Sequence, residues 1–190
     1  LTLSGINTYT GLTTVSAGTL KLGIVNAIPS TNSITIAGDT SVLDINGLNI
    51  TLSTLTVTSG LTAGCVIDSF ATKGSITAST YTMSHTNNTT ISAKLAGTSG
   101  LIKSGAGVLT LSAINTYTGG TTITGGTIMI GASNAILGDV TMNGTDAVLN
   151  IQTYAISIGR LTVNNGLSTG CVIGTGTISA TYNYIISNST

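Results

Sequence analysis

The stretch LTLSGINTYTG occupies residues 1–11, and LTLSAINTYTG repeats it almost unchanged at residues 109–119. Further along, SGLTAGCVI at residues 59–67 pairs with NGLSTGCVI at residues 165–173. Self-similarity at such a distance is typical of repeat architectures, in which each unit buries its apolar face against its neighbours. The repeat therefore decides the fold class before any single residue does.

The two copies do not keep one constant spacing. The second copy follows the first by 108 residues at its start (109 − 1) and by 106 residues at the cysteines (171 − 65). A two-residue deletion after the NAI segments at Asn26 and Asn134 accounts for this drift. We predict one continuous solenoid, with a first long repeat at 1–108 and a second, incomplete one at 109–190. The chain starts inside a strand-like LTLS without Met or signal peptide, so we expect its natural ends to lie outside these residues.

Charged residues make up only 5% of the chain, with five basic and five acidic side chains and a net charge of zero. A neutral chain lacks the basic face that nucleic acids require and the polybasic segment that anionic lipids attract. No apolar run approaches the roughly 20 residues of a membrane-spanning helix. We therefore expect no nucleic-acid partner and no membrane span within these residues.

Short segments of alternating apolar and hydroxyl residues run along the whole chain, and Gly, Asn or Ser separates them. This pattern predicts β-strands, and the scarcity of Glu, Gln, Lys and Arg argues against helix. A sandwich built from hairpins is the competing fold, yet only Asn46-Gly47 and Asn143-Gly144 offer hairpin turns. The chain also has no Trp and one Phe for a sandwich core. An all-β parallel β-helix (β-solenoid) of about nine coils, with essentially no helix, fits better; at about 4.8 Å per coil it would be on the order of 45 Å long.

The segment GLIKSGAGVLTLSAINTYTGGTTITGGTIMIG (residues 100–131) resembles the autotransporter-associated β-strand repeat, also called the passenger-associated transport repeat. The resemblance extends to the first copy from Leu1 onward. It implies a right-handed parallel β-helix that is secreted through a bacterial outer membrane and displayed on the cell surface. The motif positions in the second copy are Gly100, Leu101, Lys103, Gly105, Gly107, Leu109, Leu111, Ser112, Asn115, Thr116, Tyr117, Gly119 and Thr121.

Cys65 and Cys171 occupy equivalent places in the two copies, each within GCVI. About five coils separate them, which corresponds to roughly 24 Å and exceeds the ~7 Å limit between the Cα atoms of a disulfide. We predict two buried free thiols that act as small apolar side chains, with bridges between chains as the alternative. No disulfide within one chain is expected.

Several polar residues are candidates for a functional site. His85 is alone in SHTNN and is interpreted as a surface residue. Tyr9 and Tyr117 belong to the NTYTG turns, where we expect the ring to pack on a neighbouring coil with an exposed hydroxyl; sugar stacking is the alternative. Asp39 and Asp44 flank a turn and are interpreted as turn residues, although parallel β-helices also host glycan-cleaving enzymes with paired carboxylates. We predict no catalytic, cofactor-binding or metal-binding residues.

Glycine and asparagine motifs complete the set. The GAG of residues 105–107 lacks the following helix of a phosphate-binding loop. Asparagines in glycosylation acceptor patterns are Asn49, Asn87, Asn88, Asn143 and Asn188, as chance predicts in a chain so rich in Asn and Thr.

These observations favour a non-enzymatic, extracellular, structural or adhesive solenoid, either a surface-displayed passenger or a filament subunit. Its expected partners are further copies of itself, stacked head to tail at the solenoid ends, or a neighbouring cell surface or glycan. An ice-binding solenoid is an alternative because Thr56/Thr58 and Thr122/Thr124 form Thr-x-Thr pairs. Such a protein needs the pair on every coil, whereas the outward residues here vary. A carbohydrate-active enzyme is the remaining alternative.

Overall fold

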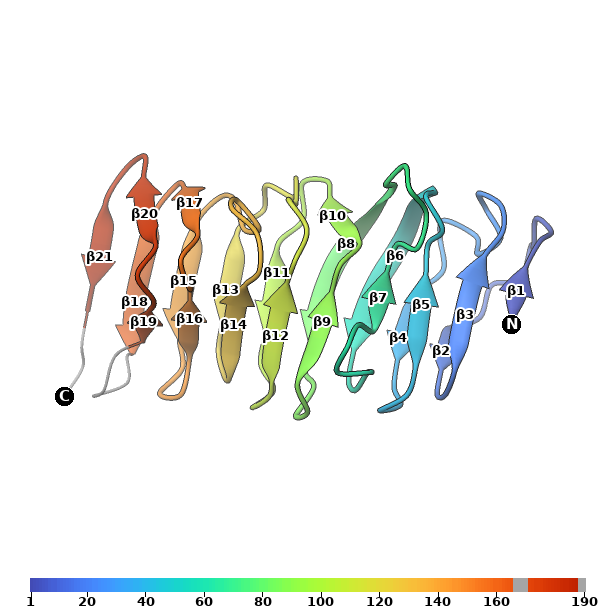
Figure 1. Cartoon of the computed structure of the whole chain (residues 1–190), viewed down its shortest axis with the longest axis horizontal. Coiled ribbons are helices and arrows are strands. Elements are labelled where there is room, and N and C mark those ends of the chain that lie inside the picture. Colours follow the sequence, from blue (N-terminus) through green and yellow to red (C-terminus); the bar gives the residue numbers. More distant parts are fainter. Residues whose placement is uncertain (166–170, 188–190) are drawn as a thin grey trace.

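A computed structural model describes residues 1–165 and 171–187. Every regular element in these residues is a β-strand, and every pairing between strands is parallel, as expected of a solenoid. Successive strands stack along one long axis, from the blue N-terminal end to the red C-terminal end (Figure 1). The prediction of an all-β solenoid of about nine coils is therefore confirmed. The hand of the winding stays a prediction.

Two long sheets form lateral walls. The first contains nine strands in the order β1 (Thr2–Leu3), β3 (Thr19–Leu22), β5 (Val42–Asp44), β7 (Val66–Ile67), β9 (Thr89–Ile91), β12 (Val108–Leu111), β14 (Thr127–Ile130), β16 (Val148–Asn150) and β19 (Val172–Ile173). The second follows the order β2 (Thr13–Val15), β4 (Ile34–Ile36), β6 (Asn49–Val57), β8 (Ser75–Met83), β11 (Leu101–Lys103), β13 (Thr121–Ile123), β15 (Val140–Asn143), β18 (Leu161–Asn165) and β21 (Tyr184–Ile186).

A third wall is less continuous than the other two. The long strands β6 and β8 pair over nearly their whole length, and the first residues of β8 also pair with β10 (Lys94–Ala96). Nearer the C-terminal end, β17 (Ala155–Ile158) pairs with β20 (Thr177–Ala180). The chain thus contributes strands to the walls in turn, and each coil lies one strand further along the solenoid than the previous coil.

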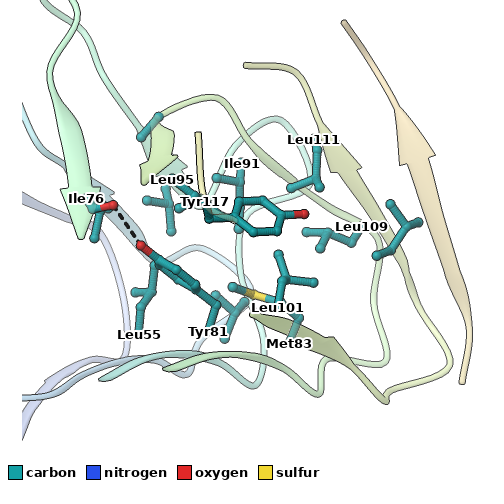
Figure 2. Close-up of a cluster of buried hydrophobic side chains, with 14 of the residues drawn as sticks. Leu55, Ile76, Tyr81, Met83, Ile91, Leu95, Leu101, Leu109, Leu111 and Tyr117 are labelled. Carbon is teal, nitrogen blue, oxygen red and sulfur yellow. Dashed lines mark hydrogen bonds between the residues drawn. The ribbon is translucent and has the colours of Figure 1, made fainter. Parts of the chain in front are cut away.

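The lumen between the walls is packed with medium-sized apolar side chains, as the alternation of the strands predicts. Residues at one inward position of the second sheet lie in register and are buried: Ile34, Leu55, Tyr81, Leu101, Thr121, Val140 and Leu161. Two tyrosines enlarge this core at its centre. The rings of Tyr81 and Tyr117 lie 6.2 Å apart, and Figure 2 shows them among the buried leucines and isoleucines.

The two copies adopt the same turn conformations, which locates the drift between them. Asn26 and Asn134, 108 residues apart, have φ of 62° and 54°. Asn46 and Gln152, 106 residues apart, have φ of 50° and 53°. Such left-handed conformations are uncommon outside glycine, so their recurrence marks equivalent turns. The two-residue deletion therefore lies between these turns.

Among the described residues, no helix has the length and apolarity to cross a membrane.

Candidate functional site

The outward face of the second sheet carries a column of threonines. Its nine stacked positions, in register from coil to coil, are Thr14, Thr35, Thr56, Thr82, Ile102, Thr122, Thr141, Thr162 and Ile185. Threonine holds seven of these nine positions, so this column is more regular than the sequence analysis expected. The neighbouring outward column is mixed, with Thr58, Ser84, Ser104 and Thr124 at successive coils. A Thr-x-Thr pair is therefore absent from several coils.

Asp44 has a structural role, because hydrogen bonds within the fold engage its carboxylate. Its carboxylate is 4% exposed and accepts hydrogen bonds from the backbone N–H groups of Asn46 (2.9 Å) and Ser69 (3.0 Å) and from the Ser69 hydroxyl (2.6 Å). The Lys21 ammonium lies 3.5 Å away. Burial alone would raise the pKa of Asp44, but these hydrogen bonds and the Lys21 charge hold it below its usual value. Asp39 is exposed and accepts a hydrogen bond from Ser59.

The prediction that His85 lies on the surface is wrong. Its side chain is fully buried, and Nδ1 pairs with the Asn87 carbonyl at 2.7 Å while Nε2 has no partner. Burial, together with the positive charge of Lys103, lowers the pKa of His85. The imidazole is therefore neutral near pH 7. His85 continues the alternation of Tyr81 and Met83, so its side chain points into the lumen as theirs do.

Lys103 is buried beside His85, although nothing in the sequence analysis gave it a role beyond a motif position. Its ammonium donates hydrogen bonds to the carbonyls of Gly105 and Gly125, the latter at 3.4 Å. These carbonyls belong to turns of successive coils, so the lysine joins two coils from inside. Burial lowers the pKa of Lys103 from 10.5 to about 8, and Asp146 opposes that shift.

We expect the free energy of unfolding to rise between pH 8 and pH 9. In this window the unfolded chain keeps the proton on Lys103 while the folded chain releases it, so stability increases by about 1 kcal/mol. Above pH 9 the slope should flatten, because burial raises the pKa of the Cys65 thiol from 9.0 to about 11 and the unfolded chain then binds fewer protons there. Urea titrations at successive pH values measure this. Lys103→Met should abolish the rise, and an unchanged slope in that variant would contradict the assignment.

The two motif tyrosines make the same hydrogen bond in both copies. The Tyr9 hydroxyl pairs with Thr13 at 2.5 Å and the Tyr117 hydroxyl pairs with Thr121 at 2.7 Å. Tyr117 is fully buried, so the predicted exposed hydroxyl is wrong for this residue, and its ring is not available to a sugar. Tyr9 is 38% exposed.

The cysteines are both free, with Cys65 buried and Cys171 half-buried. Five strand steps separate their strands along the first sheet, from β7 to β19, as the repeat spacing predicts. Among residues 1–165 and 171–187, no three His, Cys, Asp or Glu side chains lie together as metal ligands would.

The glycine motif of residues 105–107 has a structural role. A Cβ added to Gly105 would lie 2.0 Å from the His85 carbonyl oxygen, and one added to Gly107 would lie 2.1 Å from that of Asn87. The GAG therefore permits close stacking of coils. Of the acceptor asparagines, Asn49, Asn88 and Asn143 are exposed, Asn87 is half-buried, and Asn188 lies outside the described residues.

The passenger-associated-transport-repeat family matches the chain at residues 1–22 and 101–130. Both stretches are passenger-associated transport repeats. The buried Tyr117 and Lys103 belong to the second of these repeats, and Tyr9 to the first. The second repeat thus contains both partners of the Lys103–Gly125 contact between successive coils.

A comparison with curated proteins finds similarity beyond these two stretches. The chain is similar to the protein named adhesin BmaC autotransporter from Brucella suis biovar 1 (strain 1330), with 32% identity over 185 residues. That similarity covers 94% of this chain, and the chain spans about 5% of the relative's length. The comparison with solved structures found no match.

Proposed function

We propose that this chain is a segment of a surface-displayed, adhesive autotransporter passenger, without catalytic activity. The single observation that carries the proposal is its similarity, along nearly its whole length, to an adhesin. The structure supports it in two ways. Two sheets run the length of the solenoid and make a stiff rod suited to holding a binding surface away from a cell. The carboxylates that an enzyme would use are either engaged by backbone, as in Asp44, or isolated, as in Asp39.

Adhesion is tested with beads coated with the folded chain. We expect such beads to be retained on cell layers or on bacterial lawns well above beads that carry the urea-unfolded chain, which shares the composition but not the surface. Retention equal to that of the unfolded control on every surface would contradict the proposal.

Self-assembly is a further element of the proposal. If these residues form a free subunit, its two ends expose apolar side chains, with Leu1 83% and Leu12 60% exposed at one end and Tyr182 72% and Ile186 76% exposed at the other. Edge strands with unpaired backbone groups invite pairing with another chain. Stacking of copies end to end would give open filaments. Negative-stain electron microscopy of the concentrated protein would show such filaments, and short separate rods alone would contradict head-to-tail assembly.

The threonine column favours one second candidate, an ice-binding face. The column is uncharged and regular over four coils, from Thr14 to Thr82, before Ile102 interrupts it. The mixed neighbouring column makes this the weaker candidate. Thermal hysteresis that is lost in Thr56→Lys would support it, and freezing without hysteresis would exclude it.

A further inference from the structure

One connection between strands differs between the two long repeats. From β7 to β8 the chain runs through residues 68–74, whereas the equivalent link from β19 to β20 has only residues 174–176. The first copy therefore carries four extra residues in a coil that is otherwise the same. Insertions in solenoids project from one face, and such loops often carry the binding residues of a rigid scaffold.

This loop is held in one shape by a buried carboxylate. The Asp68 side chain is 6% exposed and accepts hydrogen bonds from the backbone N–H groups of Gly47 (2.7 Å), Phe70 (3.2 Å) and Gly74 (2.7 Å). The loop also presents Phe70, which is 53% exposed. A loop fixed by three such bonds is preorganised for contact with a partner.

Beside the loop lies a groove of about 300 Å³, which we call the Lys73 groove. Its lining comes from the loop, from the segment between β9 and β10 together with the first residue of β10, and from the segment after β12: Lys73, Ser92, Lys94, Ser112, Ala113 and Ile114. No acidic side chain of the described residues lines it. The lining thus combines two lysines and two serines with the apolar Ala113 and Ile114, and Ile114 is 64% exposed.

The charge around the groove is unbalanced in a chain whose net charge is zero. Lys73 is exposed and bonds only to the Asp68 carbonyl at 2.5 Å, while Lys94 has no hydrogen-bond or ion-pair partner among the described residues. Lys21 lies 3.3 Å from the Ser69 hydroxyl of the loop, but its charge is paired with Asp44 at 3.5 Å, so the unpaired cations here are Lys73 and Lys94. The nearby carboxylates of Asp44 and Asp68 are buried and engaged by backbone N–H groups. The exposed charge is therefore positive, and it attracts anions from solution.

We propose that the Lys73 groove binds an acidic polysaccharide, with Lys73 and Lys94 on its carboxylate or sulfate groups and Ser92 and Ser112 on its hydroxyls. The exposed Ile114 offers apolar surface to the C–H face of sugar rings. Its size suits one or two sugar units, at the small end of ligand sites. This inference rests on the proposed adhesive function and names the ligand class for it.

The test measures binding of the 190-residue chain to immobilised heparin, alginate and neutral dextran by biolayer interferometry. Heparin carries sulfates and alginate carries only carboxylates, so the two arms distinguish the anionic group. We expect binding to one or both acidic polymers, none to dextran, and loss of binding at high salt. The double variant K73Q/K94Q should weaken binding about tenfold or more.

Matched controls separate the groove from charge in general. Arg160→Gln and Lys73→Gln each remove one positive charge, but Arg160 lies between β17 and β18 towards the C-terminal end, where it donates a hydrogen bond to Asn183 at 2.8 Å. Arg160→Gln should leave the affinity within about twofold. Replacing residues 68–73 with Gly-Thr, the link used by the second copy, should remove binding while the melting profile stays cooperative.

Three results would overturn the inference: no binding to either acidic polymer at low salt, equal binding by K73Q/K94Q, or equal weakening by Arg160→Gln. The loop-replaced variant also separates this inference from the proposed function. If its beads still adhere to cells, the groove is not the adhesive site and the adhesive function stands. If even the unaltered chain gives no adhesion, the proposed function fails, whatever the polysaccharides show.

Discussion

Gly126→Ala is expected to lower the free energy of unfolding by about 2 to 5 kcal/mol. Gly126 has a φ of +66°, and an added Cβ would lie 2.2 Å from the Gly105 carbonyl oxygen on the preceding coil. The left-handed conformation alone costs about 1–2 kcal/mol for a residue with a Cβ. The clash adds about 1–3 kcal/mol, because backbone on a packed coil cannot move away easily. Urea unfolding followed by circular dichroism measures the change.

Gly18→Ala is the matched control. Gly18 is the equivalent residue of the first copy and has the same φ of +66°, yet no atom lies within 4 Å of an added Cβ. It should therefore cost only the conformational strain, about 1–2 kcal/mol. Equal losses for the two variants would mean that coil stacking contributes nothing at Gly126, and this would contradict the register of the solenoid.

Tyr117→Ala is expected to cost about 3–5 kcal/mol, because it removes a fully buried ring from the lumen and leaves a cavity. It also leaves the buried Thr121 hydroxyl without its 2.7 Å partner. Tyr117→Phe keeps the ring and should cost about 1 kcal/mol for the lost hydrogen bond. Thermal and urea unfolding of the three proteins give these differences.

Tyr9→Ala supplies the control within the same chain. Tyr9 makes the same contact to Thr13 but is 38% exposed, so we expect a loss of about 1 kcal/mol. A loss in Tyr9→Ala as large as in Tyr117→Ala would show that the NTYTG tyrosine acts within its own turn. It would then not act by packing inside the lumen.

The repeat and the period-two alternation are sufficient to predict the solenoid, its coil number and the absence of a link between Cys65 and Cys171. The same alternation also indicates which polar side chains point inward. Lys103 has the parity of Leu101, and His85 has the parity of Met83, so both were due to point inward. The polarity of His85 favoured a surface interpretation instead, and Lys103 was identified only as a motif position. Alternation alone cannot reveal that the Lys103 ammonium donates hydrogen bonds to the turn carbonyls of Gly105 and Gly125.

The candidate surfaces needed the register between coils. The threonine column joins residues whose separation varies from 19 to 26, because loops of different length intervene between its coils. A search of the sequence for threonines at one fixed spacing would therefore not find this column. The Lys73 groove likewise combines residues from three coil segments. The loop beside it can be found from the sequence by aligning the two copies through the GCVI and the GSI/GTI segments, whose offsets differ by four (106 − 102).

The coil-by-coil register underlies both the threonine column and the Lys73 groove, and spin-label distances test it most directly. In a background with Cys65→Ala and Cys171→Ala, labels at Thr35→Cys and Thr122→Cys stand four strand steps apart, and labels at Thr35→Cys and Thr162→Cys stand six steps apart. The solenoid predicts separations of about 19 Å and about 29 Å, since each step is about 4.8 Å. A Thr35–Thr162 distance no longer than the Thr35–Thr122 distance would contradict the stacked register and the surfaces built on it.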